Sequence, residues 1–182
     1  MNTALLIIDV QNDYFEGGIM ALFGSEQASV NIGKILDRFR MKHLPVIHIQ
    51  HIANRPTATF FLPDTFGAKI HSHVEPLKDE AVFIKHYPNS FRETGLKEHL
   101  EKQGITHLVI CGMMTHLCVD ATVRAAKDFG YDCTLIGDGC ATKDLEINGN
   151  TIKAESVHHS FLAALNYFYS EVKTTEQFLK GF

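Results

Sequence analysis

Short apolar runs alternate with helical patterns along almost the whole chain, and this alternation constrains the fold most. The run at 4–8 is apolar without interruption, which is typical of a strand buried on both faces of a parallel sheet. The segment 25–43 follows with apolar residues at helical spacing, behind Ser25 as the expected N-cap. The same order of strand and helix repeats toward the C-terminus. The pattern therefore predicts an α/β protein with a mostly parallel sheet.

The remaining elements follow from the same periodicity. We expect further strands at 45–50, 81–84, 106–111 and 132–136 and near Val172, and further helices at 95–103, 117–129, 152–169 and 175–179. These elements predict a three-layer, Rossmann-like fold in a single domain spanning residues 1–182. The stretch 51–80 holds three of the five prolines, and its length of about 30 residues exceeds an ordinary connection, which favours a functional segment.

Composition excludes several classes of protein. The chain has 182 residues, 45% of them hydrophobic, and 17 Lys and Arg against 21 Asp and Glu leave a net charge of −4. That balance gives no electrostatic reason to bind nucleic acid or an anionic membrane. The apolar runs are far shorter than the roughly 20 residues of a membrane-spanning helix. The N-terminus lacks the basic region of a signal peptide, so we expect a cytoplasmic protein with reduced thiols.

Three strands are followed by residues that carry chemistry. Asp9 follows the first strand, Lys85 follows the third, and Cys118 opens the helix after the fourth. In an open parallel sheet, ligands bind beyond the carboxyl ends of the strands, at the switch point of the strand order. Taken singly, such residues are more often a cap, a solvated side chain and a packing residue. Their coincidence at one end of one sheet favours a catalytic site.

The position of Cys118 suits a nucleophile. Only the thiolate attacks well, and a helix N-terminus and a nearby lysine both lower the pKa of a thiol, so we expect a lowered pKa here. Asp9 is placed to accept the thiol proton as general base. Backbone N–H groups of the loop 112–118 are candidates for an oxyanion hole.

At these residues the chain resembles the isochorismatase-like hydrolases, the cysteine hydrolase superfamily. The segments that carry the resemblance are 5–13, Lys85 with 88–91, 111–122 and 138–142. The resemblance implies a six-stranded sheet of order 3-2-1-4-5-6 and an Asp–Lys–Cys triad, carried onto Asp9, Lys85 and Cys118. It also implies a cis peptide bond between Met113 and Met114, with the N–H groups of Met114 and Cys118 as the oxyanion hole.

The implied reaction is hydrolysis of a small amide or related C–N bond through a thioester. Isochorismatases cleave a vinyl ether and do not need the cysteine, so Cys118 favours amidase chemistry over ether hydrolysis. The sequence does not distinguish a cyclic amide substrate, as in the streptothricin-hydrolase-like members, from a linear amide. A non-catalytic binding protein on the same fold stays an alternative, and a phosphoryl-accepting receiver domain is disfavoured because its acceptor Asp should end strand 3.

We expect no cofactor and assign no metal. Nicotinamidases of the superfamily carry an Asp-x-His element just after strand 2, and the chain has no Asp at that place. Four histidines in and near the stretch 51–80 are conceivable ligands, but spacing alone does not bring them together. They are His48, His51, His71 and His73.

The expected partner is a small-molecule substrate, in a homodimer or homotetramer. Aromatic and polar residues of the loops are the candidates for substrate binding, because an apolar pocket with a few polar groups suits a small apolar amide. The candidates are Gln11, Phe15, Phe60, Ser90, Phe91 and His116.

Overall fold

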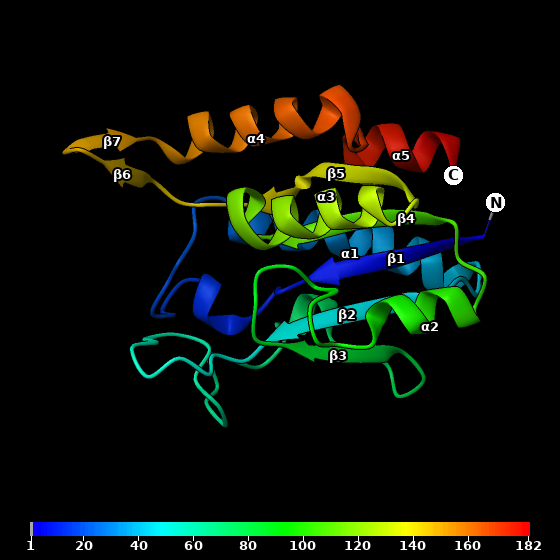
Figure 1. Cartoon of the computed structure of the whole chain (residues 1–182), viewed down its shortest axis with the longest axis horizontal. Coiled ribbons are helices and arrows are strands. Elements are labelled where there is room, and N and C mark those ends of the chain that lie inside the picture. The colour runs from blue at the N-terminus through cyan, green and yellow to red at the C-terminus, as the bar shows by residue number, and fades with distance from the viewer. Residues whose placement is uncertain (1) are drawn as a thin grey trace.

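A six-stranded parallel sheet forms the centre of the molecule (Figure 1). The computed structural model describes residues 2–182, so Met1 of the expected domain lies outside the described residues. In spatial order the strands are β3 (Ala81–Lys85), β2 (Val46–His51), β1 (Thr3–Ile8), β4 (His107–Met113), β5 (Asp132–Ala141) and β8 (Glu171–Lys173). The predicted order is confirmed. The last strand is the eighth in the chain because a short hairpin precedes it.

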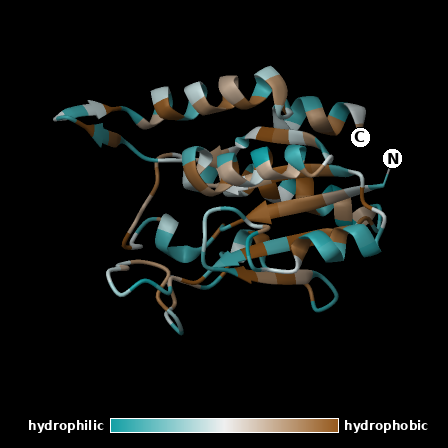
Figure 2. Ribbon diagram, viewed as in Figure 1, coloured by the Kyte–Doolittle hydropathy of each residue, from teal (hydrophilic) through white to brown (hydrophobic). Residues whose placement is uncertain are grey.

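Helices cover both faces of the sheet. They are α1 (Ser25–Met41), α2 (Leu96–Lys102), α3 (Asp120–Asp128), α4 (Ala154–Phe168) and α5 (Thr175–Gly181). Alternate side chains of β1 divide between two cores, since successive residues of a strand point to opposite faces. Leu5 and Ile7 join the core under α1 and α5, whereas Leu6 and Ile8 join the core under α2, α3 and α4. Figure 2 shows β1 as one of the most apolar ribbons.

Some expected boundaries are wrong. Gly24, with a φ of 76°, is the N-cap of α1, and Ser25 is the first helical residue. A π-helical turn, Thr115–Val119, precedes α3, so Cys118 lies in that turn rather than in the α-helix proper. The strand expected to end at residue 136 continues to Ala141 because its end pairs with Gly112 and Met113 across a register shift.

The hairpin of β6 (Leu145–Ile147) and β7 (Asn150–Ile152) was not predicted. Its turn is Asn148–Gly149, and both residues have positive φ, 52° and 74°. Asn-Gly is the preferred pair for a two-residue hairpin turn of this kind, so a local signal existed. Because β7 takes the residues up to Ile152, α4 begins at Ala154 rather than at 152.

The segment 51–80 packs against the loop that follows β1. Asn12 donates its N–H to the Lys69 carbonyl at 3.0 Å, and an Asp13 carboxylate oxygen accepts the Phe61 N–H at 2.7 Å. The long stretch is therefore held by the chain itself, at the end of the sheet where β1 and β2 finish (Figure 1).

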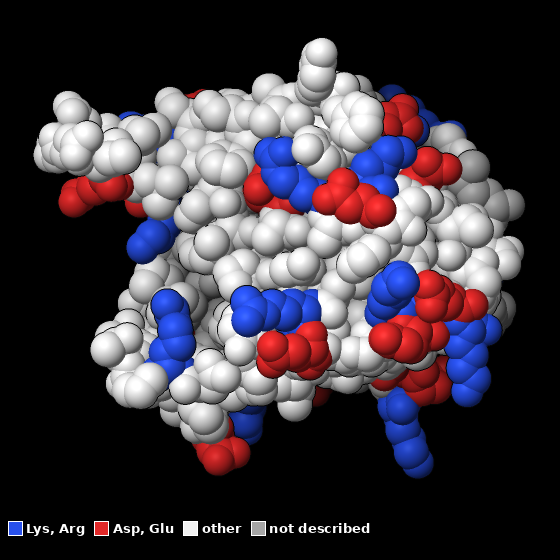
Figure 3. Space-filling model, in the orientation of Figure 1, with Lys and Arg blue, Asp and Glu red and all other residues white. Residues whose placement is uncertain are grey.

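Charges are mixed on the surface. Figure 3 shows Lys and Arg interspersed with Asp and Glu on the face in view, without a field of one sign. Among residues 2–182, no helix combines the length and the apolarity needed to cross a membrane.

Candidate active site

Asp9 and Lys85 form a fully buried ion pair at the carboxyl end of the sheet. The distance from Lys85 Nζ to Asp9 Oδ2 is 2.7 Å, and both side chains have 0% exposure. Asp9 follows β1 with a φ of 51°, a left-handed conformation uncommon for a residue other than glycine. Strand β2 separates β1 from β3, and the lysine side chain spans that interval, as the sequence analysis requires.

The charge states of the pair follow from its surroundings. Burial opposes the charge of Lys85, but the Asp9 carboxylate and Cys118 outweigh it and raise the pKa of the ammonium. Burial raises the pKa of Asp9, against the lowering effect of Lys85. A carboxylate with a raised pKa is a better proton acceptor than an exposed one.

Cys118 lies beside this pair. One Asp9 carboxylate oxygen, one His51 ring nitrogen and the Cys118 Sγ all lie within 4.8 Å of one another. Burial, with the charge of Asp9, raises the pKa of the thiol, and Lys85 only partly offsets this. The expected lowering of the pKa is therefore wrong, because the thiol is only 2% exposed and desolvation outweighs the lysine.

His51 is a member of the site that the sequence analysis considered only as a metal ligand. Lys85 Nζ contacts Asp9 Oδ2 at 2.7 Å, the Tyr87 carbonyl at 3.0 Å and His51 Nδ1 at 3.1 Å. An ammonium has three N–H donors and no acceptor, so His51 Nδ1 must accept. The ring proton of neutral His51 is therefore on Nε2. Burial and the charge of Lys85 lower the pKa of His51 to about 3, which keeps the ring neutral.

The contacts of Lys85 also bear on whether this cluster binds a metal ion. In neutral His51, Nδ1 accepts from Lys85 and Nε2 carries the ring proton, so His51 has no free lone pair to offer a metal ion shared with Asp9 and Cys118. The ammonium thus supplies the positive charge between the carboxylate and the imidazole. We assign no metal to this cluster.

Aromatic side chains surround the loop after β1. Tyr14 is 1% exposed and its ring centroid lies 4.6 Å from that of Phe61 and 6.0 Å from that of Phe60. Burial and the charges of Cys118 and Asp9 raise the pKa of the Tyr14 phenol. Phe15, a predicted pocket residue, stacks on His71 at 3.7 Å between ring centroids. Tyr14 and Phe61 were not predicted as site residues.

The π-helical turn that holds Cys118 follows the cis peptide bond that the resemblance implies. The peptide bond between Met113 and Met114 is cis. The Met114 carbonyl accepts from the Leu117 and Val119 N–H groups, which closes the turn around Cys118. The roles of the Met114 and Cys118 N–H groups in an oxyanion hole stay predictions.

Three predicted substrate contacts make defined contacts within the chain, and their role toward a substrate stays a prediction. Gln11 is fully buried; its Oε1 accepts the His51 N–H at 2.7 Å, and its Nε2 donates to the His51 carbonyl at 2.9 Å and to the Ala68 carbonyl at 2.7 Å. The Ser90 N–H donates to the Thr122 hydroxyl oxygen at 3.0 Å. Phe91 packs against Phe129 and Tyr131 in the core under α2, α3 and α4. Buried polar groups need partners, and the backbone and a neighbouring helix supply them here.

His116 points toward the end of β5. Its Nδ1 lies 2.5 Å from the Thr142 hydroxyl oxygen, and its ring lies against Phe161. The four histidines near 48–73 divide among three places. His48 pairs with Glu80 at 3.0 Å, His51 with Lys85, and His71 with His73. A single metal site built from all four is therefore wrong.

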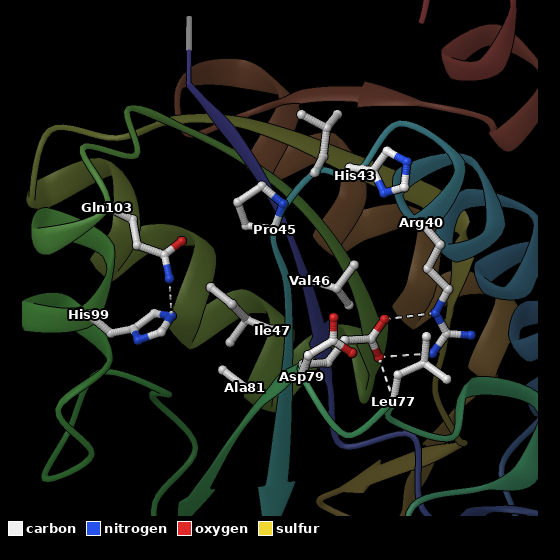
Figure 4. A pocket seen from close by; sticks show the side chains of 12 residues that line it. Arg40, His43, Pro45, Val46, Ile47, Leu77, Asp79, Ala81, His99 and Gln103 are labelled. Carbon is white, nitrogen blue, oxygen red and sulfur yellow. Dashed lines mark hydrogen bonds and ion pairs between the residues drawn. The ribbon is translucent and has the colours of Figure 1, made fainter.

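A separate cavity of ≈ 520 Å³ lies at the opposite end of the sheet (Figure 4). Val46 and Ala81, the first residues of β2 and β3, line it together with His99 and Gln103. Its floor includes the Arg40–Glu80 ion pair at 2.7 Å. The cavity does not touch the cluster at the carboxyl ends of the strands, so it is not the candidate active site.

A carboxylate, an ammonium and a thiol thus lie together at the switch point of a doubly wound parallel sheet, the place where open α/β sheets bind their ligands. Residues 3–177 match the family described as Isochorismatase domain. The chain belongs to the isochorismatase family of hydrolases.

Similar proteins agree with this assignment. The uncharacterized isochorismatase family protein YddQ of Bacillus subtilis (strain 168) is 52% identical over 180 residues, covering 99% of this chain and 100% of that protein. The crystal structure of a presumed isochorismatase hydrolase from Oleispira antarctica has a TM-score of 0.93 at 47% identity, covering 98% and 96% of the two chains. A streptothricin hydrolase of Streptomyces noursei is 33% identical over 142 residues, covering 78% of this chain and 50% of that protein.

Proposed function

We propose that this hydrolase cleaves a small amide or related C–N bond through a thioester on Cys118. The observation that carries the proposal is the contact of Asp9, Lys85 and Cys118 in a buried cluster at the switch point of the sheet. A thiol at this position is not needed for hydrolysis of a vinyl ether, whereas a thioester route depends on it. Similarity to a streptothricin hydrolase supports hydrolytic chemistry.

The first half of the reaction makes the thioester. Asp9 takes the proton from Cys118 Sγ as the sulfur attacks the carbonyl carbon, because a thiol with a raised pKa needs an adjacent base. The Met114 and Cys118 N–H groups donate to the developing oxyanion. Asp9 then gives the proton to the leaving nitrogen, and the C–N bond breaks. Ammonia or an amine leaves, and the acyl group stays on sulfur.

The second half releases the acid. Asp9, again a carboxylate, takes a proton from water as the water oxygen attacks the thioester carbon. The C–S bond breaks, and the proton returns from Asp9 to sulfur. Throughout, Lys85 stabilises the anion on whichever of Asp9 and Cys118 carries it, since it lowers the pKa of both groups. His51, neutral and accepting from Lys85, holds the ammonium without adding a second charge.

The surroundings favour a small, partly apolar acyl group. Tyr14, Phe60 and Phe61 lie around the loop after β1, close to the cluster. Aromatic side chains beside a reactive cluster favour ligands that bind mainly through apolar contact, with a few polar groups that orient them. We therefore expect aromatic and branched aliphatic amides among the substrates, linear or cyclic.

The test is an ammonia- and amine-release screen of small linear and cyclic amides. Cys118→Ala should lower turnover of any substrate found by roughly 10³-fold or more. Cys133→Ala, a matched buried cysteine on β5, should keep it. Acid-quenched wild-type reactions should carry the acyl mass on the Cys118 peptide. Full turnover by Cys118→Ala would overturn the thioester route, and ligand binding without turnover would favour a non-catalytic binding protein.

A further inference from the structure

A second group of potential ligands lies outside the Asp9–Lys85–Cys118 cluster. Glu26 is in the first turn of α1, and His71 and His73 flank the start of the 3-10 turn Ser72–Val74. One ligand atom from each of the three lies within 4.8 Å of the others. The three residues come from two segments that the fold packs together, α1 and the segment 51–80.

Ser29 decides which nitrogen of His73 is free. The Ser29 hydroxyl donates its single proton to the Glu26 carbonyl at 2.8 Å. The remaining contact, 2.8 Å between Ser29 Oγ and His73 Nδ1, then requires that Nδ1 donates. Neutral His73 therefore carries a lone pair on Nε2. A histidine whose Nδ1–H is held by an oxygen acceptor while Nε2 is free has the arrangement usual for metal-bound imidazole.

His71 is fixed in place beside it. Its backbone N–H donates to the Val10 carbonyl at 2.9 Å, and its ring stacks on Phe15 with an interplanar angle of 10°. The two imidazole rings meet edge to face, 4.6 Å between centroids. The Nδ1 atom of His71 accepts only a long 3.3 Å contact from the His73 N–H. This long hydrogen bond is weak, so a bound ion can take its place, and the stacking on Phe15 orients the ring.

Glu26 supplies the negative charge. None of the ion pairs formed within residues 2–182 uses the Glu26 carboxylate. Two imidazoles and one carboxylate are a donor set that suits Zn²⁺ and neighbouring transition metals. Mg²⁺ and Ca²⁺ prefer oxygen ligands and fit the set poorly.

We propose that Glu26, His71 and His73 bind a divalent transition-metal ion such as Zn²⁺. The ion would tie the segment 51–80 to the start of α1. The backbone N–H of His71 donates to the Val10 carbonyl, and its ring stacks on Phe15. The bound ion would therefore also stabilise the loop that follows Asp9. The proposal does not rest on the proposed reaction, because no ligand belongs to the cluster of Asp9, Lys85 and Cys118.

Calorimetric titration of the chelator-treated protein with Zn²⁺ tests the proposal. We expect one bound ion per chain, with affinity lowered by roughly tenfold or more in His73→Gln and in Glu26→Gln. Ser29→Ala should weaken binding to a smaller degree, since it removes only the acceptor that orients His73. His159→Gln, an exposed histidine on α4, should bind as wild type. Mg²⁺ should not bind.

Two further readouts locate the ion. Co²⁺-loaded protein should give visible absorption bands that change in Glu26→Gln, because a carboxylate ligand is lost. Cys118→Ala should leave Zn²⁺ affinity unchanged. Equal affinity in wild type, His73→Gln and Glu26→Gln would overturn the proposal, and so would loss of binding in Cys118→Ala, which would put the ion at the thiol instead.

Discussion

The Lys85 ammonium shows how one buried side chain organises a site. Its three donors meet a carboxylate, a carbonyl and an imidazole, so every N–H is used and every partner has a defined protonation state. A fully buried charge is tolerated only with such partners. Removing one partner leaves the other groups without compensation.

Lys85→Met tests this at the level of stability. The substitution leaves the Asp9 carboxylate buried without a counter-charge, so the free energy of unfolding should fall by about 3–5 kcal/mol at neutral pH. The loss should shrink as the pH falls and Asp9 becomes protonated. Urea unfolding measures both effects. Lys97→Met, which breaks the exposed pair with Glu101, should change stability by about 0.5 kcal/mol or less. A Lys85→Met protein as stable as Lys97→Met would contradict the argument.

His51 should leave a pH signature. Its pKa is lowered from 6.5 to about 3, by burial first and then by Lys85. Between these values the unfolded chain binds a proton at His51 and the folded chain does not, so stability rises with pH in this window. The contribution is fully present above pH 6.5 and is lost as the pH falls toward 3.

The comparison of wild type with His51→Gln isolates that proton. Unfolding measured from pH 3.5 to 7 should be less pH-dependent in His51→Gln, by up to about 1.4 kcal/mol per pH unit. His43→Gln, an exposed histidine after α1, should keep the wild-type slope. Parallel curves for wild type and His51→Gln would mean that His51 titrates normally in the folded protein.

At the scale of elements, the join between β1 and β4 depends on a glycine. Gly112 pairs with Ile8 and has a φ of 131°, and an added Cβ would lie 2.1 Å from the Ile8 carbonyl oxygen. Both the conformation and the space exclude a side chain. This close approach aligns β4 with β1 just before the π-helical turn that holds Cys118.

Gly112→Ala should therefore destabilise the fold by about 4 kcal/mol or more, among the largest effects of a single methyl group. Thermal unfolding and the soluble yield measure it. Gly181→Ala, where an added Cβ meets nothing within 4 Å, serves as control. If Gly112→Ala melted at the wild-type temperature, β1 and β4 could move apart to admit the methyl group without loss of stability, and the close pairing of Gly112 with Ile8 would not matter for the fold.

At the scale of the whole molecule, several hydrogen bonds hold the segment 51–80 against the loop after β1, and Asp13 makes two of them, to Gly67 and to Phe61. The Asp13 carboxylate accepts the Phe61 N–H, and its Oδ1 would lie 2.0 Å from a Cβ added at Gly67. Asp13→Ala should raise hydrogen exchange in residues 51–70 and leave β1 and β4 protected, because it removes the side-chain acceptor of the Phe61 N–H and weakens the attachment of this segment. Glu16→Ala, exposed in the same loop, should exchange as wild type. If residues 51–70 exchanged at the same rate in Asp13→Ala as in Glu16→Ala, Asp13 would not be holding this segment in place.

Self-association as a homodimer or homotetramer stays a prediction. Helix α4 leaves Tyr167 92% exposed and Phe168 65% exposed, and apolar surface of this kind is typical of interaction sites. Sedimentation should give a species of two or four chains at micromolar concentration. A single species of the chain mass, 20.4 kDa, would count against it.

Local patterns were enough to predict a mostly parallel sheet and three side chains at its carboxyl end, whereas the strand order came from the family resemblance. The uninterrupted apolar run before Asp9, and the strand and turn that carry Lys85 and Cys118, are features of neighbouring residues in the chain. The carboxyl ends of parallel strands lie at the same end of the sheet. A carboxylate, a lysine and a cysteine that each follow a strand are therefore expected to lie near one another, and this already indicated a catalytic site.

Only the tertiary structure decided what those side chains meet. His51 joins Lys85 because β2 and β3 pair His51 with Lys85, a register that no local spacing contains. The sequence predicts Gln11 and Ser90 as substrate contacts, and only the packed structure shows that Gln11 bonds to the His51 backbone and Ser90 to Thr122. The pKa of the Cys118 thiol is raised, whereas the sequence predicted that it is lowered. A helix start and a lysine are visible in the sequence, whereas the desolvation that outweighs them exists only once the chain is packed.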